Sequence, residues 1–464
     1  MLIGAGIGAG IGATVAQAVG KPLRITVGAN MNVSRAGGNQ AEQTVAVNPT
    51  NPANIVVVSN DANPGPGLFE SFTFDGGATW TGRLIATGAD ELGAACCDPS
   101  LAFDSFGNLF FTYLLSSLPD AIPVALSTDG GRHFATLGLV SAKGTGSSDP
   151  TKGSVKGSFA DQPSITTGAG SVWVTVTAGS GHIVAAGARV TGLGGVSTFS
   201  PTDVMQGLGG HGDYGDVAIG PSGQVMVTYQ YPTGGEGPAK IWTVLDPDGL
   251  GPLTFGKPTL LATTNVGGFD FIPAQVTRSV DAEANLAWDR SGGPHSGRLY
   301  VIWTSETPDE SSNTDIMLQH SDDSGAHWSP PTKVNDDHGT NSQFNPAIAV
   351  DQSSGAIGIS WYDARNDLGL GGSGDTNGVP NDDAQIWGTI SLDGGGTLAA
   401  DAQISAGTSN SAAAASGVDY GDYTHDAFIA GVFYSCWSDN SNSTGDNPDG
   451  ALSKLDVYVA KVTA

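Results

Sequence analysis

Short apolar runs separated by turn residues recur along the whole chain. The runs are rich in Val, Ile, Leu, Phe and Trp, and Gly, Pro, Asn or Asp stand at their ends. No long stretch has apolar positions at the three- and four-residue spacing of an amphipathic helix. The pattern therefore predicts an all-β fold made of many short strands.

A unit of two consecutive strands is repeated along the chain. Each copy has an acidic or Pro-containing start, a short apolar strand, a turn and a stronger strand. The copies occupy residues 42–59, 98–115, 161–177, 213–230, 281–304, 345–362 and 422–437. The length of 464 residues would by itself suggest two or three domains, but the repeats predict one continuous array instead.

Each unit can be extended to four strands, which in the second unit are SLAFD, NLFFTYL, PVALS and FATLGLV. Six units have all four strands, whereas the seventh ends after its third strand, at residues 456–462. One strand near the start, residues 23–28 with an extension to Val33, belongs to no unit and can complete the seventh. We therefore predict that residues 21–464 form a single seven-bladed β-propeller of four-stranded antiparallel blades, closed by the N-terminal strand. Six blades is the alternative.

Four predicted turns share the pattern Ser/Thr-x-Asp-x-Gly-x-x followed by an apolar residue. They lie at residues 73–80, 127–134, 321–328 and 391–398. Their marker residues are Asp75, Trp80, Asp129, Phe134, Asp323, Trp328 and Asp393. The Asp side chain can accept hydrogen bonds from turn N–H groups, Gly supplies a positive φ, and the aromatic residue anchors the turn on the sheet. We expect these turns to be structural.

This turn pattern resembles the Asp box, or BNR repeat, of the sialidase-like β-propellers. A sialidase-type site requires three Arg residues that bind a carboxylate, a Tyr activated by a Glu, and an Asp that acts as acid and base. Arg35, Arg278 and Arg365 fall on loops of the expected functional face. No Tyr–Glu pair can be assigned, and seven blades depart from the six of the sialidases themselves. The resemblance therefore implies the architecture more strongly than the activity.

The first strand of every unit starts with an acidic residue or Asn. In order, these residues are Glu42, Asp98, Asp161, Asp213, Glu283, Asn345 and Asp422. In a propeller, such positions surround one mouth of the central channel. Carboxylates that lie so near to one another raise each other's pKa, and they attract a cation, sugar hydroxyls or water. The alternative is that each carboxylate only accepts hydrogen bonds from turn N–H groups.

Three carboxylates are the candidate catalytic residues of a glycoside hydrolase. Asp161 and Asp213 come from the predicted ring, and Asp363 comes from the run Trp361–Asp367 in a neighbouring loop. A second shared element, His-Gly-Asp-Tyr at 211–214 and Gly-Asp-Tyr-Thr-His at 421–425, could bind a transition metal or be purely structural.

Two loops, residues 374–383 and 439–449, are rich in closely spaced Asp, Asn and Gly. Their candidate calcium ligands are Asp375, Asn377, Asp382, Asp383, Asp439 and Asp446. Oxygen ligands of this kind suit Ca²⁺, although neither loop has the spacing of an EF-hand. A solvated loop without an ion is the alternative.

The charge balance of the chain excludes one class of partner. There are 18 basic and 45 acidic residues, a net charge of −27, which argues against nucleic-acid binding because that needs Lys and Arg on the phosphates. It suits a soluble protein that is secreted or held at the cell surface. Residues 1–20 are apolar and rich in Gly and Ala, and they contain Ala16-Gln17-Ala18, which resembles an export-signal cleavage site. No membrane span is expected.

The three cysteines do not form a disulfide framework. Cys96 and Cys97 are adjacent and Cys436 is distant in sequence, which leaves open free buried thiols, a vicinal disulfide, or reactive or metal-binding thiols. From these features we expect a propeller that binds a glycan or an extracellular protein, with Ca²⁺. A glycoside hydrolase and a structural surface or assembly protein are the alternatives, and the fold does not choose among them.

Overall fold

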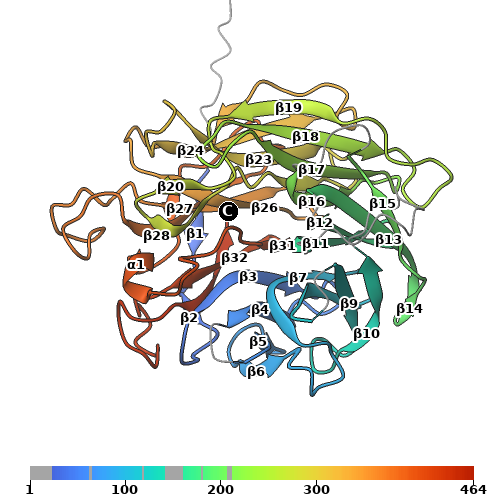
Figure 1. Ribbon diagram of the computed structural model, residues 1–464, viewed down its shortest axis with the longest axis horizontal. Helices are drawn as coiled ribbons and strands as arrows, with labels where there is room; N and C mark the ends of the chain where they lie inside the picture. Colours follow the sequence, from blue (N-terminus) through green and yellow to red (C-terminus); the bar gives the residue numbers. More distant parts are fainter. Residues whose placement is uncertain (1–22, 62–64, 118–119, 142–159, 179–180, 206–211) are drawn as a thin grey trace, which may run out of the picture.

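A computed structural model describes residues 23–61, 65–117, 120–141, 160–178, 181–205 and 212–464. The proposed signal segment, residues 1–20, lies outside these ranges. The described residues form seven antiparallel sheets of four or five strands, arranged around a common axis as Figure 1 shows, and one separate two-stranded hairpin. Within the described ranges the only helix is the single turn α1 (Ser411–Ala414). No helix there has the length and hydropathy that crossing a membrane requires.

The first four blades follow one another along the chain. Blade 1 is β3 (Gln40–Val47), β4 (Ile55–Asp61), β5 (Leu68–Thr73) and β6 (Thr81–Ile85). Blade 2 is β7 (Ala95–Phe103), β8 (Leu109–Leu115), β9 (Ala121–Ser127) and β10 (Ala135–Ser141). Blade 3 is β11 (Asp161–Gly168), β12 (Ser171–Ala178), β13 (His182–Gly192), β14 (Gly195–Val196) and β15 (Ser200–Asp203). Blade 4 is β16 (Asp213–Ile219), β17 (Val225–Pro232), β18 (Ala239–Asp246) and β19 (Thr259–Thr264).

A short hairpin, β20 (Asp270–Ile272) and β21 (Gln275–Val280), precedes the last three blades. Blade 5 is β22 (Asn285–Trp288), β23 (Leu299–Glu306), β24 (Thr314–Ser321) and β25 (Thr332–Lys333). Blade 6 is β26 (Gln343–Val350), β27 (Ile357–Asp363), β28 (Asp383–Ser391), β29 (Ala402–Gln403) and β30 (Ser409–Asn410). Blade 7 is β31 (Ala427–Ile429), β32 (Val432–Asp439), β33 (Asp456–Thr463) and the N-terminal β1 (Thr26–Val27) and β2 (Met31–Asn32).

The two ends of the described chain share blade 7, so the predicted closure by the N-terminal strand is confirmed. In β1, Val27 pairs with Val462, and in β2, Asn32 pairs with Tyr458. The Asn32 side chain also donates to Asp456 Oδ2 at 2.6 Å. The prediction of seven blades is therefore correct, and six blades is excluded.

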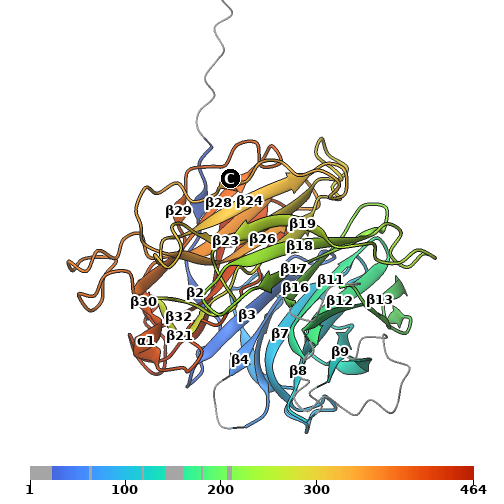
Figure 2. The ribbon, with the colours of Figure 1, turned by 45° about the horizontal axis from the view of Figure 1, so that its top comes forward.

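The core consists of apolar layers between neighbouring blades. A middle strand packs against a blade on each side, so both of its faces are buried; all seven residues of β8 are buried. This position explains the unbroken apolar run LFFTYLL, because a strand buried on both faces has no polar alternation. In Figure 2 the strands that line the axis, β3, β7, β11 and β16, follow one another around it.

The four turns with the Ser/Thr-x-Asp-x-Gly pattern all join the third and fourth strands of their blades and share one hydrogen-bond arrangement. In blade 2, Ser127 Oγ donates to Asp129 Oδ1 at 2.8 Å and accepts from the Gly131 N–H at 2.9 Å. Asp129 Oδ1 also accepts from the His133 N–H at 3.0 Å. The equivalent bonds occur around Asp75, Asp323 and Asp393. These hydrogen bonds stabilise the turn conformation, which is consistent with the expected structural role.

The cysteines differ in state. Cys96 and Cys97 form a vicinal disulfide, directly before the channel-mouth residue Asp98. Cys436 is a buried free thiol. Of the alternatives left open by the sequence, the structure therefore has the vicinal disulfide for the adjacent pair.

Candidate acidic site at the channel mouth

Six of the seven innermost segments bend at the same place, at a residue with left-handed backbone. Their φ values lie between 41° and 57° at Glu42, Asp98, Gln162, Tyr214, Glu283 and Asn345. In five of them the register to the partner strand shifts at the bend, as in a β-bulge. Asp161 and Asp213 stand one residue before the bend, so the predicted alignment is offset by one residue in blades 3 and 4.

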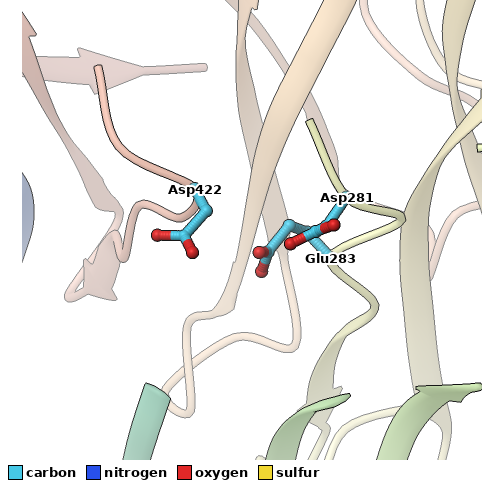
Figure 3. Close-up of side chains that lie close together, drawn as sticks. All are labelled: Asp281, Glu283 and Asp422. Carbon is cyan, nitrogen blue, oxygen red and sulfur yellow. The ribbon is translucent and has the colours of Figure 1, made fainter. Parts of the chain in front are cut away.

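Seven carboxylates gather at this mouth, and we call them the acid ring. Its members are Glu42, Asp98, Asp161, Asp213, Asp281, Glu283 and Asp422. Asp281 and Glu283 come from one segment and Asp422 from another, on opposite sides of the space seen in Figure 3. One oxygen atom of each of these three side chains lies within 4.8 Å of the other two.

Arg278 is a positively charged residue that contacts the acid ring. Its guanidinium forms an ion pair with Asp422, and its backbone N–H donates to Asp419 Oδ2 at 2.9 Å. Burial alone would lower the pKa of Arg278, but the charges of Asp281 and Glu42 more than offset it, and the pKa is raised. The hairpin β20–β21 carries Arg278 into place because Gln275 Nε2 donates to the Gly421 carbonyl at 2.6 Å.

Gln162 connects opposite sides of the ring. Its Nε2 donates to Asp422 Oδ2 at 2.6 Å and lies 3.5 Å from Glu283 Oε1. Its backbone N–H donates to Asp98 Oδ2 at 3.2 Å. The side-chain and backbone amides of this one residue therefore contact three carboxylates that come from different parts of the ring.

The ring carboxyls hold protons more tightly than free carboxyls. Burial, and then the nearby carboxylate of Asp98, raises the pKa of Asp161 to about 7. Burial, and then the charge of Asp161, raises the pKa of Asp213 to about 6. Burial followed by a neighbouring carboxylate also raises the pKa of three other members, Glu42, Asp281 and Glu283. Protonated and ionised carboxyls therefore coexist at this mouth near neutral pH.

A pocket of about 560 Å³ opens on this face, and the side chains of Asp161 and Asp213 lie in its wall. The rest of the wall is made largely of glycine-rich loops after β12, β17 and β19. Phe269 also lines it, with 54% of its surface exposed. The Arg278 guanidinium lies 5.8 Å from the centre of the Phe269 ring.

The three arginines predicted from the sequence are not brought together, because each pairs with different carboxylates. Arg35 pairs with Asp446 at 2.7 Å, and only Arg278 reaches the acid ring. Arg365 contacts Asp336, Asp363 and Asp401. Asp363 is buried and also accepts from Trp361 Nε1 at 2.7 Å, so it belongs to a local network around Arg365.

The two acidic loops are organised differently. In the first, the carboxylates of Asp382 and Asp383 lie with Asp367, with one oxygen of each within 4.8 Å of the others. Asp375 there accepts from the Gly378 N–H, and Asn377 donates to Asp382 at 2.8 Å. In the second loop, Asp439 accepts from Trp437 Nε1 at 3.1 Å, and Asp446 pairs with Arg35. Only the first loop gathers carboxylates.

Only part of the shared His-containing element lies within the described residues. His211 lies outside the described residues. His425 is buried, and burial lowers its pKa to about 4, so it is neutral at physiological pH. Its ring lies 5.4 Å from that of Tyr423, beneath the acid ring.

Sequence reasoning missed Gln162, Asp281 and Phe269. A signal for Gln162 exists, because Asp98, Gln162 and Asn345 each directly precede a proline. Alignment on that proline puts Gln162, not Asp161, at the bend. Asp281 stands at the acidic start of the fifth repeat, but the alignment places Glu283 in the ring. Phe269 directly precedes the inserted hairpin, which no other unit repeats, so no local pattern identifies it.

No family model and no curated protein matches this chain. Solved structures do resemble it. An α-L-arabinofuranosidase of Fusarium graminearum is 14% identical, over 73% of this chain and 93% of its own, with a TM-score of 0.45. A protein of unknown function from Dyadobacter fermentans is 11% identical, over 95% and 99%, with a TM-score of 0.49. A Hadza microbial sialidase is 12% identical, over 88% and 73%, with a TM-score of 0.44. Similarity at this level does not bear on activity.

Proposed function

We propose that this protein binds a neutral glycan in the pocket beside the acid ring. The observation that supports this is one pocket of about 560 Å³ that combines two carboxylates, Asp161 and Asp213, with the exposed ring of Phe269. Carboxylates accept hydrogen bonds from adjacent sugar hydroxyls, and an aromatic face packs against the C–H face of a sugar. The surplus of carboxylates disfavours an anionic sugar at the same place.

Replacing Phe269 by Ala is expected to weaken glycan binding by about tenfold or more, because the stacking face is lost. The matched control is Phe271→Ala, since Phe271 is also exposed, at 48%, but does not line the pocket. Calorimetric titration of a panel of neutral oligosaccharides measures both. Equal losses in the two variants, or no binding by the unaltered protein, would contradict the proposal.

Hydrolysis of the bound glycan is the second candidate function, and the raised pKa values of Asp161 and Asp213, about 7 and about 6, favour it. A carboxyl that keeps its proton near neutral pH can act as general acid beside an ionised partner that activates water or attacks the sugar. The same panel should then release reducing ends, less so as the pH rises above about 7. The Asp161→Asn variant should still bind the oligosaccharides but should no longer release reducing ends. Binding without release identifies a binding module.

We also propose that Ca²⁺ binds between Asp367, Asp382 and Asp383. Their oxygens lie within 4.8 Å of one another, and Asp382 Oδ1 has no hydrogen-bond partner. Calcium added to EDTA-treated protein is expected to raise the unfolding temperature, and Asp382→Asn should reduce that rise. Asp309→Asn is the control, because Asp309 is exposed and outside the group. An unchanged rise in Asp382→Asn would rule out this loop.

Secretion remains part of the proposal. The Cys96–Cys97 disulfide supports it, because disulfides persist in oxidising compartments outside the cytosol.

A further inference from the structure

The opposite mouth of the channel has its own cavity, of about 550 Å³. It is lined by turns that join the first and second strands of several blades, at the end away from the acid ring. Its apolar lining residues include Pro49, Pro52, Phe103, Phe106, Phe428 and Ile429. Phe106 is 44% exposed and therefore accessible to a ligand.

Arg290 stands at the inner end of this cavity. It lines both the outer cavity and a deeper one of about 260 Å³ inside the channel. Its Nη1 donates to the Ile219 carbonyl at 2.7 Å and its Nη2 to the Thr167 carbonyl at 3.1 Å. Arg290 follows β22 of blade 5, and these two bonds attach its guanidinium to blades 3 and 4.

Arg290 differs from five other arginines of this protein in lacking an ion pair with any described residue. The five that form one are Arg35, Arg83, Arg278, Arg298 and Arg365. Burial lowers the pKa of Arg290 to about 10, which still leaves it charged at neutral pH. The charge of Asp289 offsets only part of this burial cost, and the guanidinium forms no ion pair within the described ranges, so an anion placed beside it would relieve the remainder.

The two carboxylates in the same wall are already engaged. Asp104 Oδ1 accepts from the N–H groups of Phe106 and Asn108, at 2.8 and 2.9 Å. Asp351 accepts from the N–H groups of Ser353 and Gly431, at 2.9 and 2.8 Å. Each therefore belongs to its own turn, and backbone dipoles offset part of its charge.

We propose that this second cavity binds a small carboxylate with an apolar body, with its carboxylate on Arg290 and its apolar part against the Pro and Phe residues. The guanidinium has donors beyond the two used for backbone carbonyls, and its planar geometry matches a carboxylate. An apolar cavity with one convergent charged group is the usual form of such a site. The site is separate from the acid ring and does not depend on the glycan proposal.

The probe is phenylacetate, compared with the uncharged phenylacetamide by ligand-detected NMR in chloride-free buffer. Phenylacetate is expected to bind at least about tenfold more tightly than the amide, because only the acid forms a charge-assisted pair. Arg290→Met should abolish this difference. Phe106→Glu tests the site without touching Arg290, and it should weaken phenylacetate binding by about tenfold or more through like-charge repulsion.

Phe271→Glu is the matched control, because it puts the same charge at an exposed Phe outside this cavity. It should leave phenylacetate binding unchanged. Equal binding of the acid and the amide, no binding of either at millimolar concentrations, or full binding by Phe106→Glu would each overturn the proposal.

Discussion

Removing the strand that closes the ring, residues 23–33, is expected to abolish cooperative folding. Val33 is buried, and Met31 packs into the same layer as β33 and β3. Burying apolar side chains of this size contributes roughly 1.5–3 kcal/mol each, and the backbone pairs with β33 and the Asn32–Asp456 bond add to that. The total is comparable with the roughly 5–15 kcal/mol that stabilises a whole domain.

The measurement is thermal unfolding of a chain that starts at Ser34, alone and with a synthetic peptide of residues 23–33. The truncated chain leaves the edge of β33 unpaired and should be aggregation-prone or lack a cooperative transition. The peptide should restore the transition, and the same peptide with Val33→Asp should not. A truncated chain that unfolds cooperatively near the temperature of the full protein would show that closure is dispensable.

Lowering the pH from about 8 to about 5 is expected to stabilise the protein, measured in EDTA. A carboxyl whose pKa is raised on folding binds more protons in the folded than in the unfolded chain. Its contribution to stability is fully present below the unfolded pKa, near 4, and is lost as the pH rises through the folded pKa. For Asp161 and Asp426 the folded pKa is about 7, and for Asp213 about 6. The window of loss is therefore from about pH 4 to about pH 7.

Asp161→Asn isolates one member of the acid ring. A rise of about three pKa units corresponds to at most about 4 kcal/mol, so the variant should be more stable than the unaltered protein at about pH 8. At about pH 5, about one pH unit above the unfolded pKa, only about a third of that difference should remain, roughly 1.5 kcal/mol. The measurement is denaturant unfolding at both pH values.

Asp75→Asn is the control for this experiment. Hydrogen bonds from Thr79, and then from Thr73, lower the pKa of Asp75, and neither partner titrates between pH 5 and pH 8. Its stabilising contribution is therefore lost only as the pH falls below about 4, and its substitution should have the same effect at pH 5 and pH 8. Greater stability at pH 8 than at pH 5, or a pH-independent effect of Asp161→Asn, would contradict the assigned pKa values.

The sequence alone determined the architecture. Strand-length apolar runs, seven repeats of them, and an unmatched strand at the front led to seven blades closed by β1 and β2. The four turns with the Ser/Thr-x-Asp-x-Gly pattern could also be identified from the sequence, because their hydrogen bonds join residues two and four positions apart. These features depend on neighbours in sequence and on a repeated period, and both can be read from one chain.

The tertiary structure alone decided the composition of the sites. It brought Arg278 to the acid ring on an inserted hairpin, paired Arg35 and Arg365 elsewhere, and left Arg290 without an ion pair among the described residues. Strand bulges also moved Gln162, rather than Asp161, to the bend. Whether a charged side chain is paired, buried or exposed depends on groups that folding brings from distant blades. No periodic pattern in the sequence specifies those contacts. The sequence therefore predicts the blades, and the folded structure determines which charged side chains from different blades lie together.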